Sequence, residues 1–158
     1  MEWAWLIPVF CFVAAPIIVI SGRLLPGKGA SLSILAIGAG FVVFWVVLAS
    51  FLDAGTSTKG CFTSEDTGTL TCNFTRSWFH AGDLELFWGI IVDPLTVAML
   101  GLVTFVALLV QVYSLGYMHG DSSFSRYYAY MSLFTASMLG LVLASSILQL
   151  FVFWELVG

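Results

Sequence analysis

One carboxylate in this sequence is placed where it could do intramembrane chemistry. Glu155 stands in the apolar stretch Phe151–Gly158, whereas the other charged residues lie outside the long apolar runs or at their ends. An ionisable group at membrane depth is costly, so its default interpretation is a functional site such as a proton relay. Its own helix offers no partner, because Val152, Phe151 and Leu148 precede it at helical spacing. A carboxyl group there could accept and release a proton.

The depth of Glu155 depends on how the last apolar run folds. The run Tyr127–Trp154 could form one tilted helix of about 42 Å, which would put Glu155 at the water-exposed end of that helix. Alternatively, Ser145–Ser146 makes a tight turn and a new helix begins near Ile147. That helix would stop after about 12 residues, or about 18 Å, and the chain would then be incomplete. The pattern alone leaves both interpretations open.

Gln111 is a second candidate for a polar path. Thr104, Gln111 and Ser114 fall within one stripe of a helix. Such a stripe should face protein or water and avoid lipid. Hydrogen bonding between helices explains it better than conduction does.

The composition indicates that the helices lie in a membrane. Hydrophobic residues make up 60% of the chain and charged residues 9%, far below the charged share of soluble domains. The apolar runs do not alternate as barrel strands do, so helices must span the membrane. We therefore expect an all-α integral membrane fold with four complete transmembrane helices and the start of a fifth. The four runs are Trp3–Ile20, Ala30–Leu52, Pro94–Met118 and Tyr127–Trp154.

The basic residues predict an orientation. Arg23 and Lys28 lie in the first polar link and Arg126 in the link before the fourth run, so both links should face the cytoplasm or its equivalent. The N-terminus and residues 53–92 would then lie on the periplasmic or lumenal side. The chain divides into two helices (1–52), an exported loop (53–92) and the remaining helices (93–158). A short strand over Leu84–Trp88 is expected in the loop. The net charge of −4 arises mostly in this loop and indicates no nucleic-acid partner.

Four residues are expected to have structural roles. Asp93 should cap the third helix, which explains it better than ion entry does. Arg126 should anchor the fourth helix at the membrane surface. Cys61 and Cys72 lie in the exported loop, where they could form a disulfide worth about 3 kcal/mol or remain free thiols.

Small residues mark one face for close helix contact. Ala136, Gly140 and Ala144 recur every fourth residue, as in a small-xxx-small ridge. We expect faces of this kind to contact neighbouring membrane subunits.

Several motifs in a fixed order resemble one family. The sequence resembles the start of chain 5 (subunit L) of respiratory complex I, and its ending is closest to the counterpart of that chain in cyanobacteria and plastids. The resemblance is strong from Val92 onward and is not found across Asp53–Arg76. The motifs that carry it are Ala4-Trp5-Leu6-Ile7-Pro8, Val92-Asp93-Pro94-Leu95-Thr96, Tyr113-Ser114-Leu115-Gly116-Tyr117-Met118, Arg126-Tyr127-Tyr128-Ala129-Tyr130, Met138-Leu139-Gly140-Leu141-Val142 and Trp154-Glu155-Leu156-Val157-Gly158.

The resemblance implies an architecture and a role for Glu155. The family has roughly fourteen or more helices with inverted repeats of five, of which this sequence covers the opening. Glu155 matches the family's glutamate on the fifth helix, which is linked to a lysine that would lie beyond Gly158. The resemblance favours the tight turn at Ser145–Ser146, with Glu155 near mid-membrane. Gln111 departs from relatives that place an ionisable residue there, and an amide cannot titrate.

The resemblance also implies a function. We expect a proton-translocating, antiporter-like membrane-arm subunit of a complex I type quinone oxidoreductase, in a bacterial inner membrane or a thylakoid membrane. Flavin, iron–sulfur clusters and quinone are expected in other subunits, because three scattered cysteines and two histidines form no such ligand set here. Its partners would be other membrane-arm subunits and the bilayer. Two rivals remain: the large subunit of a cation/proton antiporter, and a truncated scaffold. The pumped ion, H⁺ or Na⁺, stays open.

Overall fold

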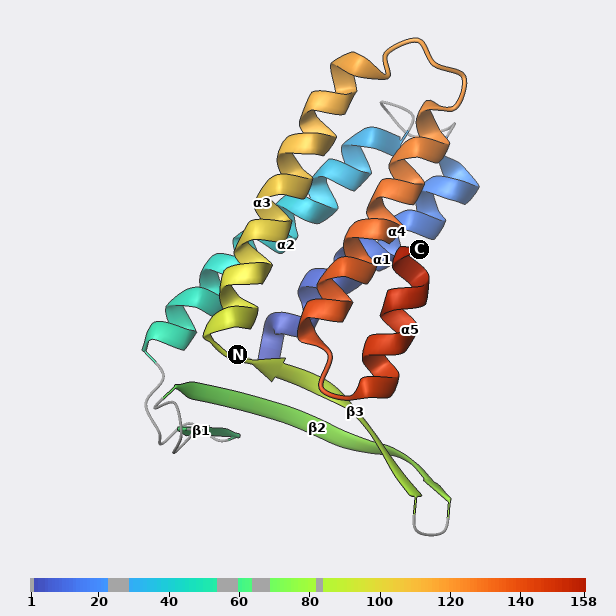
Figure 1. Cartoon of the computed structure of the whole chain (residues 1–158). Helices are drawn as coiled ribbons and strands as arrows, with labels where there is room; N and C mark the ends of the chain where they lie inside the picture. Colours follow the sequence, from blue (N-terminus) through green and yellow to red (C-terminus); the bar gives the residue numbers. More distant parts are fainter. Residues whose placement is uncertain (1, 23–28, 54–59, 64–68, 82–83) are drawn as a thin grey trace.

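The computed structural model describes residues 2–22, 29–53, 60–63, 69–81 and 84–158. Helices dominate it, and a small sheet lies across one end of them (Figure 1). Arg23 and Lys28, on which the predicted orientation partly rests, lie outside the described residues. In chain order the elements are η1 (Glu2–Trp5), α1 (Leu6–Ser21), α2 (Ala30–Leu52), β1 (Cys61–Thr63), β2 (Leu70–Ala81), β3 (Leu84–Val92), α3 (Pro94–Tyr117), α4 (Phe124–Leu143) and α5 (Ile147–Val157).

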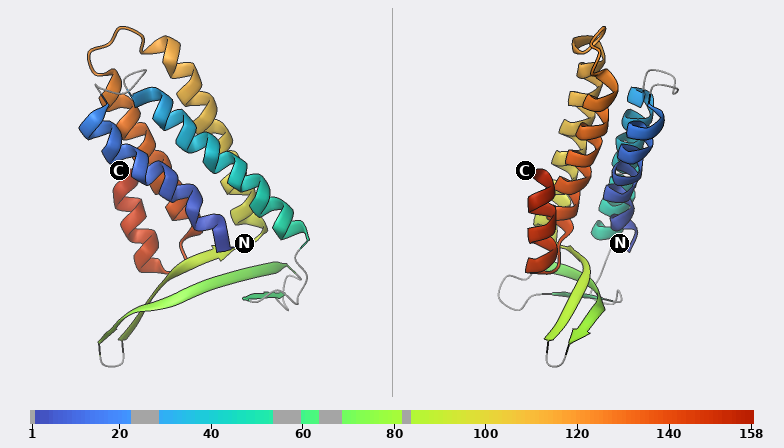
Figure 2. Two further views of the ribbon diagram at one scale, coloured as in Figure 1. Left: turned by 180° about the vertical axis from the view of Figure 1, so that it is seen from behind. Right: turned by 90° about the vertical axis from the view of Figure 1, so that its right-hand side faces the viewer.

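The four long helices form a bundle of two layers. Figure 2 shows α1 and α2 in one layer and α3 and α4 in the other. Across the layers α1 contacts α4 and α2 contacts α3, while α5 lies along α4. Within the described residues, three helical stretches are long and apolar enough to cross a membrane: Trp3–Ser21, Ala30–Leu52 and Pro94–Tyr117. The predicted count of four complete spans therefore stays a prediction, while a mostly helical membrane protein is confirmed.

The sheet shows that the all-α prediction was incomplete. β1, β2 and β3 form an antiparallel sheet in that order, at the end of the bundle where α2 ends and α3 begins. The pairing joins Cys61 to Cys72 and Arg76 to Trp88. The expected short strand is part of the longer β3, which runs directly into α3. A segment outside the hydrocarbon core of the membrane still needs hydrogen-bond partners for its backbone N–H and C=O groups. Pairing of the strands supplies these partners.

The last apolar run is broken at the predicted turn. α4 ends at Leu143 and α5 begins at Ile147, so the single tilted helix is wrong. The Ser146 hydroxyl accepts a hydrogen bond from the Gln149 backbone N–H at 3.3 Å and caps the new helix. Ala144 has left the helix and forms an isolated antiparallel bridge with Ile90 of β3. The turn therefore connects the bundle to the sheet.

The small-residue ridge is used within this chain. Ala136 is 1% exposed, and Gly140 lies against the Phe153 ring of α5. The expected ridge ends early, since Ala144 lies beyond α4. The prediction that this face contacts a neighbouring subunit is wrong for Gly140, because α5 already covers it.

Asp93 occupies the N-cap position of α3. Its Oδ1 accepts a hydrogen bond from the Thr96 backbone N–H at 2.6 Å. Pro94 follows at the first helical position, where its missing N–H removes no helical bond. This geometry gives Asp93 a structural role at the junction of β3 and α3.

Asp93→Ala is expected to lower the free energy of unfolding by about 1 kcal/mol, because the Thr96 N–H loses its acceptor. Denaturant unfolding of the full chain in detergent would measure the loss. Asp93→Asn is the matched control, since its amide oxygen can still accept the bond. Equal losses in the two variants would contradict the capping role.

A disulfide joins the first two strands. The Cys61 and Cys72 sulfurs are bonded, and the Cys72 side chain is buried at the base of the bundle. The bond closes a loop between residues separated by 11 positions. It therefore ties β1 to the strand that pairs with β3.

Cys61→Ser is expected to destabilise the sheet by about 3 kcal/mol, because the loop is no longer closed in the unfolded state. Native-state proteolysis of the full chain should then cut the loop faster, and reductant should have the same effect on the unmodified chain. Cys11→Ala is the control, since Cys11 is a buried free thiol in α1. Unchanged cleavage of Cys61→Ser would show that the disulfide adds no stability.

Candidate functional site

Glu155 lies on the outer face of α5. This helix runs antiparallel to α4, and the chain end lies beside the middle of the bundle (Figures 1 and 2). The Glu155 side chain is exposed, as are Leu148 and Phe151, which share its stripe. The opposite side of α5 faces α1 and α4. Within this chain, Glu155 is therefore presented outward, at a level part-way along the helices.

Gln149 attaches the start of α5 to the sheet. Its Oε1 accepts a hydrogen bond from the Gly89 backbone N–H of β3 at 3.3 Å and one from the Ser145 hydroxyl at 3.4 Å. The side chain is only 3% exposed. This role was not predicted from the sequence. The one signal for it was an amide in the otherwise apolar first turns of α5.

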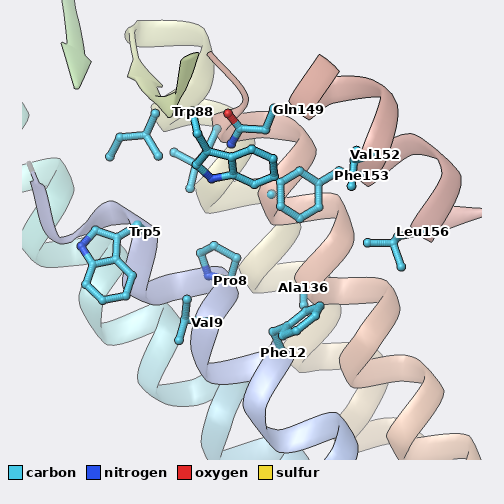
Figure 3. A pocket seen from close by; sticks show the side chains of 13 residues that line it. Trp5, Pro8, Val9, Phe12, Trp88, Ala136, Gln149, Val152, Phe153 and Leu156 are labelled. Carbon is cyan, nitrogen blue, oxygen red and sulfur yellow. The ribbon is translucent and has the colours of Figure 1, made fainter. Parts of the chain in front are cut away.

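A mostly apolar groove separates α5 from α1. It has a volume of about 390 Å³ and lies between α1, α4, α5 and β3. Figure 3 shows Gln149 beside the Trp88 indole, which is next to the Phe153 ring. The centroids of these two rings are 6.0 Å apart. The groove can hold apolar groups, and among its described lining residues there is no carboxylate, imidazole or thiol that could do chemistry.

Polar side chains from three helices meet inside the bundle, and we call Ser33, Gln111, Tyr128 and Ser132 the polar junction. The Ser33 hydroxyl of α2 donates to Gln111 Oε1 of α3 at 2.9 Å. Ser33 Oγ also lies 2.6 Å from Ser132 Oγ of α4. The Tyr128 hydroxyl donates to the Gln111 backbone carbonyl at 2.8 Å. Each of the four residues is at most 1% exposed.

The predicted stripe on α3 faces protein, as expected. Thr104 and Ser114 are 0% and 3% exposed. Thr104 donates to the Leu100 carbonyl of its own helix at 2.6 Å, whereas Ser114 Oγ lies 2.8 Å from the Tyr127 hydroxyl of α4. Interhelical hydrogen bonding, the favoured explanation of the stripe, therefore applies to Gln111 and Ser114.

The structure does not bring Glu155 and Gln111 into one site. Gln111 hydrogen-bonds to α2 and α4 inside the bundle, whereas Glu155 is on the outer face of α5. Arg126 is exposed near the start of α4, where its Nη2 lies 3.4 Å from Ser123 Oγ. Among the described residues, no three His, Cys, Asp or Glu side chains are grouped so that they could hold a metal ion.

Comparison with known proteins gives a consistent family. Residues 78–128 match the family described as the N-terminus of NADH-ubiquinone oxidoreductase (complex I) chain 5. The chloroplastic NAD(P)H-quinone oxidoreductase subunit 5 of Mesostigma viride is 38% identical over 164 residues, which cover 99% of this chain and 23% of the relative. F420H2 dehydrogenase subunit L of Methanosarcina mazei is 40% identical over 157 residues, covering 99% and 21%. The chain thus spans about a fifth of the length of these relatives, and the aligned range includes Asp53–Arg76.

A solved structure has the same fold. A chain in the Mrp complex from Dietzia sp. superposes with a TM-score of 0.66 and 25% identity, covering 97% of this chain and 14% of that one. The helical bundle and these relatives define the class as membrane subunits common to quinone oxidoreductases and the Mrp complex. Within that class, the chain belongs to the complex I chain 5 family and matches its N-terminal part.

Proposed function

We propose that the chain acts within a proton-translocating, antiporter-like membrane subunit of a complex I type quinone oxidoreductase. The observation that carries this proposal is 38–40% identity across 99% of the chain to a subunit 5 of NAD(P)H-quinone oxidoreductase and to subunit L of F420H2 dehydrogenase. The fold agrees, because stacked apolar helices with buried polar side chains suit ion passage better than redox chemistry. Quinone reduction is assigned to other subunits, which would hold the flavin and iron–sulfur clusters.

Glu155 is the proposed proton-transfer group. Intramembrane carboxylates almost always face protein or a water-filled cavity, because exposure to lipid is costly. The outer face of α5 presents Glu155 part-way along the bundle, so the assembled subunit should cover this face with protein or water. In that setting the carboxylate could accept a proton and pass it on as nearby charges change.

We also propose an orientation for the subunit in the membrane. The N-terminus of α1 and the disulfide-linked sheet lie at one end of the bundle, and α4, which carries Arg126 near its start, begins at the other end (Figure 1). We place the sheet on the periplasmic or lumenal side, where disulfides persist, and the Arg126 end on the cytoplasmic or stromal side. The membrane would be a bacterial inner membrane or a thylakoid membrane, and the partners other membrane-arm subunits.

A cation/proton antiporter is the second candidate. The fold similarity to the Mrp complex favours it, at 25% identity against 38–40% for the oxidoreductase subunits. The two functions differ in what drives ion movement.

Purification of the tagged full-length protein out of its native membrane would test the proposal. We expect quinone-reductase subunits to co-purify, and membrane vesicles to take up protons when an electron donor and a quinone are supplied. Co-purification with antiporter subunits alone, and ion exchange that needs no electron donor, would favour the second candidate. A chain that co-purifies with neither set would favour a scaffold.

A further inference from the structure

The side-chain amide of Gln111 is only half satisfied. Its Oε1 accepts from Ser33, but within the described residues its buried Nε2 has no hydrogen-bond partner. Exchanging the two amide atoms would not help, because the oxygen would then lack a donor. Either orientation leaves one strong hydrogen-bonding atom of a fully buried side chain unpaired.

An unpaired buried amide is unfavourable, and inside a membrane no bulk water offsets the loss. Tertiary packing has nevertheless placed three hydroxyl groups in this region: Ser33 bonds to Gln111 Oε1, Tyr128 to the Gln111 backbone carbonyl, and Ser132 to Ser33. A buried water molecule typically makes about three hydrogen bonds to polar groups of this kind. It can accept a bond from Nε2 and donate to hydroxyl oxygens. Water therefore fits the chemistry of the site.

We propose that Gln111 binds an internal water molecule through Nε2, and that this water and the polar junction form a proton relay. The relay part rests on the proposed proton-translocating function. Water and hydroxyl groups both donate and accept hydrogen bonds, so each hop forms one O–H bond and breaks another. One proton enters the series of hydrogen-bonded groups as another leaves it. Gln111 does not titrate and is a positioning residue that holds the water.

The location suits uptake from the end of the bundle that carries Arg126. Gln111 stands six residues before the end of α3 at Tyr117, or about 9 Å along the helix. The Ser114–Tyr127 pair, 2.8 Å apart, lies one turn nearer that end. A second pair of hydroxyl groups therefore lies between the polar junction and the link between α3 and α4.

Infrared difference spectroscopy of the whole complex can detect the water. Exchange into H₂¹⁸O should shift an O–H stretching band of the unmodified complex, and Gln111→Leu should remove that band. Thr104→Val is the matched control, because Thr104 is equally buried on the same helix but bonds only to its own backbone. It should keep the band. Absence of an ¹⁸O-sensitive band, or its persistence in Gln111→Leu, would overturn the water site.

Proton uptake by vesicles tests the relay separately. Gln111→Leu should slow uptake about tenfold, the effect expected when one hydrogen bond is lost at the barrier. Ser132→Ala should slow uptake while keeping the water band. This variant replaces Gln111→Leu as the test of the relay if Gln111→Leu does not assemble. Uptake in both variants equal to that of Thr104→Val would overturn the relay. An unmodified complex that has the band but never pumps would instead refute the proposed function and, with it, the relay.

Discussion

Glu155→Gln in the full-length subunit is expected to reduce proton translocation by about a hundredfold, the lower end of what a positioned acid–base group contributes. Glutamine has nearly the same size and shape but cannot bind and release a proton. Because the two side chains are so similar in shape and Glu155 is exposed within this chain, the fold of α5 should be preserved. The measurement is proton uptake per quinone reduced in membrane vesicles, with subunit content checked by native gel electrophoresis.

Two further variants make the test specific. Glu155→Asp keeps a titratable carboxyl group and should retain part of the activity. Asp53→Asn removes an exposed carboxylate at the end of α2 and should leave translocation unchanged. Translocation by Glu155→Gln at the rate of the unmodified complex would rule out the role assigned to this carboxylate. Loss of assembly would instead show that it holds the subunit together.

Gly140→Ala is expected to destabilise the protein by about 1 to 3 kcal/mol, the usual effect of overpacking. A methyl group at this position would lie 2.5, 2.6 and 2.7 Å from three ring carbons of Phe153. The ring would have to move toward the groove, or α5 would have to separate from α4. Thermal unfolding of the full-length subunit in detergent would measure the change.

Gly38→Ala is the matched control for this variant. Gly38 also lies in a helix, but a methyl group there would meet nothing within 4 Å. It should be neutral or stabilise α2 by up to about 1 kcal/mol, because alanine is the better helix former. Adding Phe153→Leu should recover part of the Gly140→Ala loss if the two side chains clash. Equal effects at Gly140 and Gly38, or no recovery, would contradict close packing of α5 on α4.

Local patterns predicted the features that depend on neighbouring residues. The start of α3 followed from Asp93-Pro94, since a cap and a first-turn proline act within one turn of helix. The break at Ser145–Ser146 could not be decided by pattern alone, because an apolar run of that length fits one tilted helix or two shorter ones. The family resemblance favoured the break, and the structure shows it.

The sheet was predicted only in part because strand pairing is not local. Residues 84–88 alternate weakly and indicated a strand, but β2 is visible as a strand only through its pairing with β3. The role of Gln149 was not predicted for the same reason. Its main partner, Gly89, is 60 positions earlier in the chain.

The order of residues along the chain was enough to establish a helical membrane protein of the chain 5 family, the places of its main apolar runs, and Glu155 as the acid within them. Those conclusions depend on composition, spacing and motifs, each of which lies within one stretch of chain. Packing of the helices was needed to show that Gly140 contacts α5, that Gln149 attaches α5 to the sheet, and that Gln111 joins the polar junction. The cause is separation in sequence: Ser33 is 78 positions from Gln111 and 99 from Ser132, so only three packed helices bring them together.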